Sequence, residues 1–134
     1  MKLSLGGGIS SVSRSVIDGG SLAFEFSVKT DNTGTSNNDQ FTIPINAGTF
    51  NYDISTDGGY SATGVTGAHT ITFSSGAGTY NVVITGTFPG MKFSNGGDKL
   101  KILTIDNFGI YGVGSTSQRF AFTGCSNLVV NRYR

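Results

Sequence analysis

The run from Gly78 to Gly86 constrains the fold of this chain more than any other stretch. Within it, Tyr80, Val82 and Ile84 share one parity, and polar residues fill most of the other. Because successive side chains of a strand point to opposite faces, this alternation predicts a half-buried β-strand. Val83 breaks the alternation, which indicates that the second face is partly covered. We therefore expect this run to be a central strand of a small β-sandwich.

Other short alternating runs flank this strand, and turn signals rich in Gly, Asn and Asp separate them. Such signals recur about every ten residues, which is typical of a sandwich or barrel. No segment before residue 116 has a helical apolar stripe. The apolar positions of these runs predict the core. These positions are Phe24, Phe26, Phe41, Ile43, Phe50, Ile54, Ile71, Tyr80, Val82 and Ile84.

Several local features follow from the same pattern. A strand is expected from Leu22 to Val28, followed by a polar loop over 30–39 that lacks an apolar anchor and should be a mobile tip. Pro44 cannot donate to a ladder, so its strand is expected at an edge or with a bulge. The segment 46–48 is expected to be a hairpin connection. The apolar pattern changes parity near Ile102 and Leu103, which predicts a bulge or burial on both faces.

Composition excludes several classes of protein. The 134 residues suit one domain with short appendages, and the formal net charge is +1. Only 13% of the residues are charged, so the sequence carries no electrostatic footprint for nucleic acid or an anionic membrane, and we expect neither as a partner. A polar but uncharged surface suits extracellular and viral all-β proteins. The single cysteine, Cys125, allows no intrachain disulfide and is interpreted as a small buried hydrophobe.

Residues 1–20 are rich in Gly and Ser and fit neither a helix nor a strand. We interpret them as an extended arm that becomes ordered against a partner; a floppy tail is the alternative. The apolar residues expected to dock are Leu3, Leu5, Ile9, Val12, Val16 and Ile17. The stretch lacks the apolar centre of a signal peptide, so export by the general secretory route is not expected.

No catalytic constellation is recognisable in the sequence. His69 is the one histidine and lies at an apolar parity, which favours a packed or hydrogen-bonded side chain over a catalytic base. The aspartates are spread over loops without the spacing of a calcium-binding loop. The Gly6–Gly8 run lacks the lysine of a phosphate loop. We therefore expect no enzymatic activity, no catalytic residues, no cofactor and no metal site.

The middle of the chain, from Tyr52 to Gly86, resembles an immunoglobulin-like domain of the PKD type. The matching features are the turn at Asp57–Gly59, the His69–Thr70 pair after a Thr/Gly loop, and the segment from Ala77 to Val82 that enters the late strand. The family usually carries a tryptophan near the first of these, where this chain has Ile54. The resemblance implies an antiparallel, immunoglobulin-like β-sandwich.

The segment from Phe120 to Leu128 resembles the opening of a BspA-type leucine-rich repeat, and residues 102–109 look like the junction between the two modules. Locally, Ser117 to Phe122 could form one helical turn and Leu128 to Asn131 a short strand. The expected organisation is therefore an arm over 1–20, a PKD-like sandwich over 21–107, and an irregular tail over 108–134 that resembles the start of a repeat.

These resemblances imply a binding or spacing module, because such repeats often follow PKD-like domains in bacteriophage structural proteins and bacterial surface proteins. The expected function is a structural or interaction subunit of a virion, such as a capsid decoration, head-fibre or tail-associated protein. It would be present in many copies and contact other virion proteins. The alternatives are a fragment of a bacterial surface adhesin and a carbohydrate-binding module. A host-surface glycan is a further candidate ligand.

Overall fold

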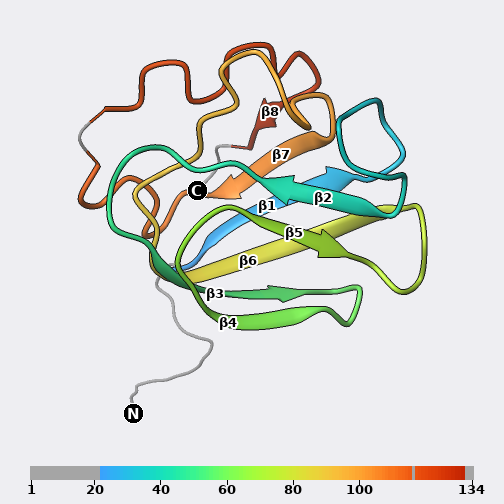
Figure 1. Cartoon of the computed structure of the whole chain (residues 1–134), viewed down its shortest axis with the longest axis horizontal. Helices are drawn as coiled ribbons and strands as arrows, with labels where there is room; N and C mark the ends of the chain where they lie inside the picture. Colours follow the sequence, from blue (N-terminus) through green and yellow to red (C-terminus); the bar gives the residue numbers. More distant parts are fainter. Residues whose placement is uncertain (1–21, 116, 132–134) are drawn as a thin grey trace.

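The protein folds into two β-sheets (Figure 1). The computed structural model describes residues 22–115 and 117–131, and these contain no helix. The strands are β1 (Phe24–Lys29), β2 (Gln40–Ile43), β3 (Asn51–Thr56), β4 (Ser61–Val65), β5 (His69–Thr72), β6 (Thr79–Thr87), β7 (Ile102–Asn107) and β8 (Val129–Val130). One sheet has the order β4-β3-β6-β1-β7-β8, and β2 pairs with β5 in the other. The all-β class is confirmed, and the two sheets are consistent with a β-sandwich.

Strand β6 lies inside the large sheet, as predicted from its alternation. It pairs antiparallel with β1 on one side and with β3 on the other. Val82 and Ile84 are fully buried, while Val83 is half-buried on the opposite face. Strands β6 and β1 are thus the two innermost strands of the six.

The core contains the predicted residues with one partial exception. Every predicted core residue is buried except Tyr80, which is half-buried. Its ring stacks on Phe73 with centroids 3.9 Å apart, and its hydroxyl donates to the Gly76 carbonyl. The ring therefore closes one end of the core, while the hydroxyl keeps a hydrogen-bond partner.

The predicted start of the first strand was wrong. Leu22 is 79% exposed, and β1 begins at Phe24. The Leu22 carbonyl accepts a hydrogen bond from the Ile110 amide instead of joining the sheet. The paired segment therefore begins only at Phe24, and the alternation of the sequence extends beyond it.

The expected hairpin at 46–48 was also wrong. Strand β2 ends at Ile43, just before Pro44, and its only partner is β5 in the small sheet. Strand β3 belongs to the large sheet, so the connection crosses from one sheet to the other. Proline has no amide hydrogen to continue a ladder, which ends β2 and confirms its position at an edge.

The irregularity predicted near Ile102 and Leu103 is a bulge in β7. Val28 faces Ile102 and Ser27 faces Thr104, so Leu103 has no direct partner on β1. A second register shift follows between Phe26 and Glu25. Each shift leaves one residue of β7 without a partner on β1, so the side chains that follow it point to the other face of the sheet. Ile102 and Ile105, which are an odd number of residues apart, are both buried as a result.

The segment Ser117–Phe122 forms turns and not the expected helical turn. Phe120 has φ +64°, which lies outside the right-handed helical region. Its carbonyl accepts from the Ser94 amide, and the Ala121 carbonyl accepts from the Phe93 amide. Pairing with the distant segment at 93–95 therefore replaces local helical hydrogen bonds. The expected strand near Leu128–Asn131 is present as β8.

The central strand supplies a direct test of the fold. Replacing Ile84 by Ala is expected to lower the free energy of unfolding by about 2–5 kcal/mol, because a fully buried side chain leaves a cavity. The matched control is Thr85→Ala on the exposed face of the same strand, with an expected change below about 1 kcal/mol. Urea unfolding of both variants measures the difference. Equal stabilities would contradict the central placement of β6.

Candidate functional site

The predicted docking residues of the arm lie outside the described residues. They are Leu3, Leu5, Ile9, Val12, Val16 and Ile17. Their role in binding a partner therefore stays a prediction.

His69 is hydrogen-bonded, as expected. Its Nε2 lies 2.5 Å from the Tyr60 hydroxyl, and its backbone pairs with Ile43 across the small sheet. Within residues 22–115 and 117–131, no serine or carboxylate oxygen contacts this ring at hydrogen-bond distance. The geometry therefore assigns His69 a contact that joins the β3–β4 hairpin to the small sheet.

The exposed carboxylates hold local backbone and side chains. Asp53 accepts from the Gly64 amide, and Asp57 accepts from the amide and side chain of Asn81. Across the described part of the chain, no group of three His, Cys, Asp or Glu residues is placed to hold a metal ion. Asp53 and Asp57 thus tie adjacent strands and turns together.

Asp98 is different, because it is only 1% exposed. Its Oδ1 accepts from the amides of Thr35 and Ser36 at 2.8 and 3.0 Å. Its Oδ2 accepts from the Ser36 hydroxyl at 2.6 Å and from the Thr42 amide at 2.8 Å. A carboxylate that accepts this many hydrogen bonds replaces most of its hydration shell.

Lys101 is the second charged residue buried in this region, with no exposed surface. Its Nζ donates to the carbonyls of Asn37 and Gln40 at 2.8 and 3.0 Å and to the Ser36 hydroxyl at 2.8 Å. The Ser36 hydroxyl in turn donates to Asp98, so it bridges the two charges. We call these residues the Asp98–Lys101 network.

The Asp98–Lys101 network corrects the expectation of a mobile tip over 30–39. The loop lacks an apolar anchor, as expected, but a buried carboxylate and a buried ammonium hold it from inside. Gly34 lies so close to Asp98 that a Cβ there would collide with the carboxylate. The loop is therefore fixed by charge-assisted hydrogen bonds where the sequence shows only polar residues.

The pKa values of the two groups reflect this environment. Burial acts to raise the pKa of Asp98, but hydrogen bonds from Ser36, Thr42 and Thr35 outweigh it and hold the pKa below its ordinary 3.8. Burial lowers the pKa of Lys101, against the opposing charge of Asp98. Because both groups are sealed from solvent, they cannot meet a substrate, and their role is structural.

Cys125 is half-buried, and burial raises the pKa of its thiol to about 11. It is packed against the hydrophobic core. A thiol with such a pKa is almost entirely protonated at neutral pH, so it is a weak nucleophile. This agrees with the interpretation of Cys125 as a small apolar residue.

Strand β8 lies at one edge of the large sheet (Figure 1). It pairs in parallel with β7, with Thr104 opposite Val129 and Ile105 opposite Val130. It is the last strand in the sheet order, and Val129 and Val130 are 58% and 41% exposed. An edge strand presents unpaired backbone groups, and here two apolar side chains accompany them. We call Val129, Val130 and this backbone the β8 edge.

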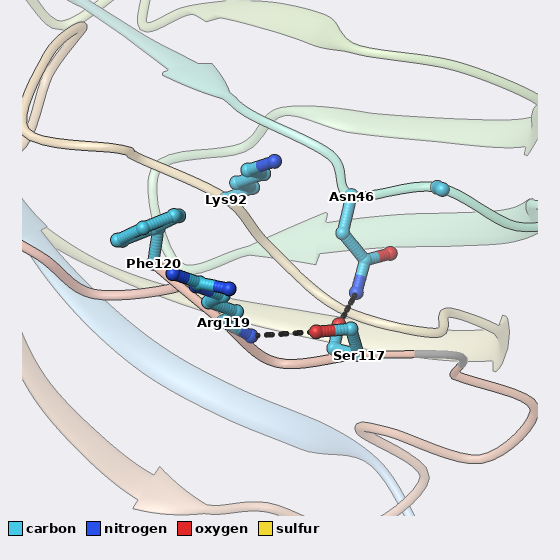
Figure 2. A pocket seen from close by; sticks show the side chains of 6 residues that line it. Asn46, Lys92, Ser117, Arg119 and Phe120 are labelled. Atoms are coloured by element: carbon cyan, nitrogen blue, oxygen red, sulfur yellow. Dashed lines mark hydrogen bonds between the residues drawn. The ribbon is translucent and has the colours of Figure 1, made fainter.

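A pocket of about 200 Å³ lies apart from the Asp98–Lys101 network (Figure 2). It is lined by Asn46, Ala47, Lys92, Ser117, Arg119 and Phe120. Figure 2 shows Lys92, Arg119 and Phe120 on one side and Asn46 and Ser117 on the other. The Asn46 side chain donates to the Ser117 carbonyl at 3.2 Å and joins the two connecting segments. Sequence reasoning missed this pocket, because its residues come from three distant segments.

Residues 22–115 and 117–131 contain no helix that is long and apolar enough to span a membrane. No family model matches the chain, and no curated protein or solved structure is significantly similar to it.

The acid stability of the protein tests the Asp98–Lys101 network. Because the pKa of Asp98 is lower in the folded protein, its stabilisation is fully present above about pH 3.8 and is lost as the pH falls through the folded pKa. Replacing Asp98 by Asn is expected to cost about 3–5 kcal/mol at pH 7 and to flatten this acid dependence.

Urea unfolding between pH 7 and pH 2 measures both effects. The control is Asp53→Asn, which removes an exposed carboxylate but keeps an oxygen acceptor for the Gly64 amide. It is expected to leave the acid dependence in place. An Asp98→Asn variant as stable as the parent at pH 7 would show that the buried charge does not hold the loop.

Proposed function

We propose that this protein is a non-enzymatic structural and interaction subunit of a bacteriophage virion. In this proposal an immunoglobulin-like sandwich of the PKD type carries one coil that resembles a BspA-type leucine-rich repeat. The observation that carries the proposal is the parallel pairing of β7 with β8, which departs from the antiparallel pairing of the other strands.

The offset of this pairing lies within the range of a leucine-rich repeat. Thr104 faces Val129 and Ile105 faces Val130, so paired residues are 129 − 104 = 25 and 130 − 105 = 25 positions apart. Leucine-rich repeats have a period of about 20–29 residues, and each repeat adds one parallel strand. The offset therefore supports the resemblance suggested by the segment from Phe120 to Leu128.

The two-sheet arrangement supports the immunoglobulin-like part of the proposal. The long strand β6 pairs with β1 and β3 in one sheet, and β2 and β5 form the facing layer. Residues of both layers, including Phe26 and Phe41, meet in the core with ring centroids 5.9 Å apart. This is the packing of a sandwich, in which side chains from two inner faces interdigitate.

The β8 edge is the surface that we propose for partner binding. An extended segment of a neighbouring virion protein can add to an exposed edge through main-chain hydrogen bonds. The exposed Val129 and Val130 side chains supply apolar area beside that backbone. A single coil buries little apolar surface by itself, and stacking another strand on it would bury more.

Analysis of purified virions tests the whole proposal. Mass spectrometry of particles from the phage that encodes the chain is expected to detect it as a stoichiometric component, with a position visible in images of the intact particle. Recovery of the chain only from the bacterial envelope, with none in particles, would overturn the virion assignment and favour a surface adhesin.

The β8 edge has its own test. A double variant, Val129→Lys and Val130→Lys, is expected to retain the parent unfolding free energy within about 1 kcal/mol, because both side chains are largely exposed. Lysines on an edge oppose addition of another strand, so incorporation into the particle is expected to fall at least about tenfold. Normal incorporation of this variant would remove the β8 edge from the proposal.

The arm is tested by truncation. A chain that starts at Ser21 is expected to fold and melt like the full chain, because the buried residues of the core cluster lie between Phe24 and Ile105. It is expected not to join its assembly, since the six apolar residues of the arm would be missing. Normal incorporation, or failure to fold alone, would refute the anchoring role. The full chain carrying Leu22→Ser, an exposed position beside the cut, is the control.

A further inference from the structure

The pocket shown in Figure 2 holds two cations that have no carboxylate partner in the part of the chain described here. Lys92 and Arg119 both line it and are both exposed. The one ion pair among the described residues joins Lys29 to Asp31 elsewhere in the structure. In a protein with few charges, two unpaired cations in one pocket create a local positive potential that favours an anionic ligand.

Phe120 gives this pocket an aromatic wall at a cost in backbone strain. It has φ +64°, a left-handed conformation that bulky side chains rarely adopt, and its ring is 47% exposed. Burial of the ring therefore does not explain the strained backbone. Such outliers persist where the surrounding structure fixes them, and they cluster at binding sites.

Hydrogen bonds from other segments hold the strained residue in place. The Ser94 amide donates to the Phe120 carbonyl at 3.0 Å, and the Phe93 amide donates to the next carbonyl at 2.8 Å. On the other side, the Gln118 side chain donates to the Pro89 carbonyl at 2.9 Å. The pocket is therefore formed before a ligand arrives, which reduces the ordering cost of binding.

The position of Arg119 suits an oxyanion ligand. Its guanidinium carbon lies 4.8 Å from the centroid of the Phe120 ring. Stacking uses the face of the guanidinium and leaves its N–H donors directed outward in the plane. None of these donors bonds an acceptor among the described residues. A planar carboxylate matches this fork with two parallel hydrogen bonds.

We propose that this pocket binds a carboxylate. Arg119 binds the group through its fork, Lys92 supplies the second positive charge, and Phe120 packs on the carbon skeleton that carries the carboxylate. The volume of about 200 Å³ is below that of drug-sized ligand sites, so it accepts one small unit. Two sources present such a unit: an acidic amino-acid side chain and a sugar acid. This site is separate from the β8 edge, and its test does not depend on the virion assignment.

Titration of the full chain, followed by amide and arginine side-chain NMR signals, tests the proposal. The probes are N-acetylglutamate, glucuronate, inorganic phosphate and neutral methyl glucoside, each at constant ionic strength. At least one of the two carboxylates is expected to give saturable shifts at residues 92 and 117–120 with a Kd near or below about 1 mM. The carboxylate probe with the lower Kd identifies whether the ligand is an acidic amino-acid side chain or a sugar acid. Phosphate is expected to bind at least about tenfold more weakly, because it has no carbon skeleton to pack on Phe120.

Four variants distinguish binding in the pocket from attraction to net charge and from a structural role of Phe120. Arg119→Gln and Lys92→Gln are each expected to weaken binding at least about tenfold, whereas Lys29→Gln, which removes the same charge elsewhere, is expected to leave it unchanged. Phe120→Gly is expected to weaken binding while the midpoint of thermal unfolding stays level or rises, because glycine adopts φ +64° without strain. A purely structural Phe120 would instead lower the midpoint.

Several outcomes would overturn the proposal. They are the absence of saturable shifts with both carboxylates, phosphate binding as tight as either carboxylate, and an Arg119→Gln variant that binds like the parent. Equal weakening by Lys29→Gln would also overturn it, by showing attraction to net charge and not to the pocket.

Discussion

The buried Asp98–Lys101 network is the interaction on which the geometry at one end of the sandwich depends. The 30–39 loop contains no apolar side chain that could hold it against the sandwich. One carboxylate collects amides from the loop and from β2, and one ammonium collects carbonyls from the same segments. Each buried charge is hydrogen-bonded to polar groups of other segments. Removal of either charged side chain therefore leaves those polar groups buried without hydrogen-bond partners.

The aromatic core performs the corresponding task in the rest of the sandwich. Phe24 and Phe26 of β1 are fully buried in the core, and Phe88 packs edge-on against Phe50 and Tyr52. The same cluster reaches the tail through Tyr111, whose ring lies 4.7 Å from that of Phe24. The tail is thus packed on the sandwich, and its β8 strand extends the sheet as a result.

This packing explains how one small structure offers two different binding surfaces. The tail ends in the β8 edge, where backbone groups and two valines face outward. The same tail returns past the 93–95 segment, which fixes Phe120 in a strained conformation beside two cations. The first surface suits an extended chain and the second suits a small anion, so the proposed roles are compatible.

The sequence by itself determined the all-β class, the central strand over 78–86, nearly all of the core and an irregularity near Ile102 and Leu103, because alternation and turn chemistry are local signals. Only the tertiary structure decided that residues 46–48 cross between sheets, since partner choice depends on how distant strands pack. Nor could local pattern show that Asp98 and Lys101 are buried together, because each residue looks like an ordinary surface charge in sequence. The pocket of Lys92, Arg119 and Phe120 likewise exists only where folding brings separate segments to one place.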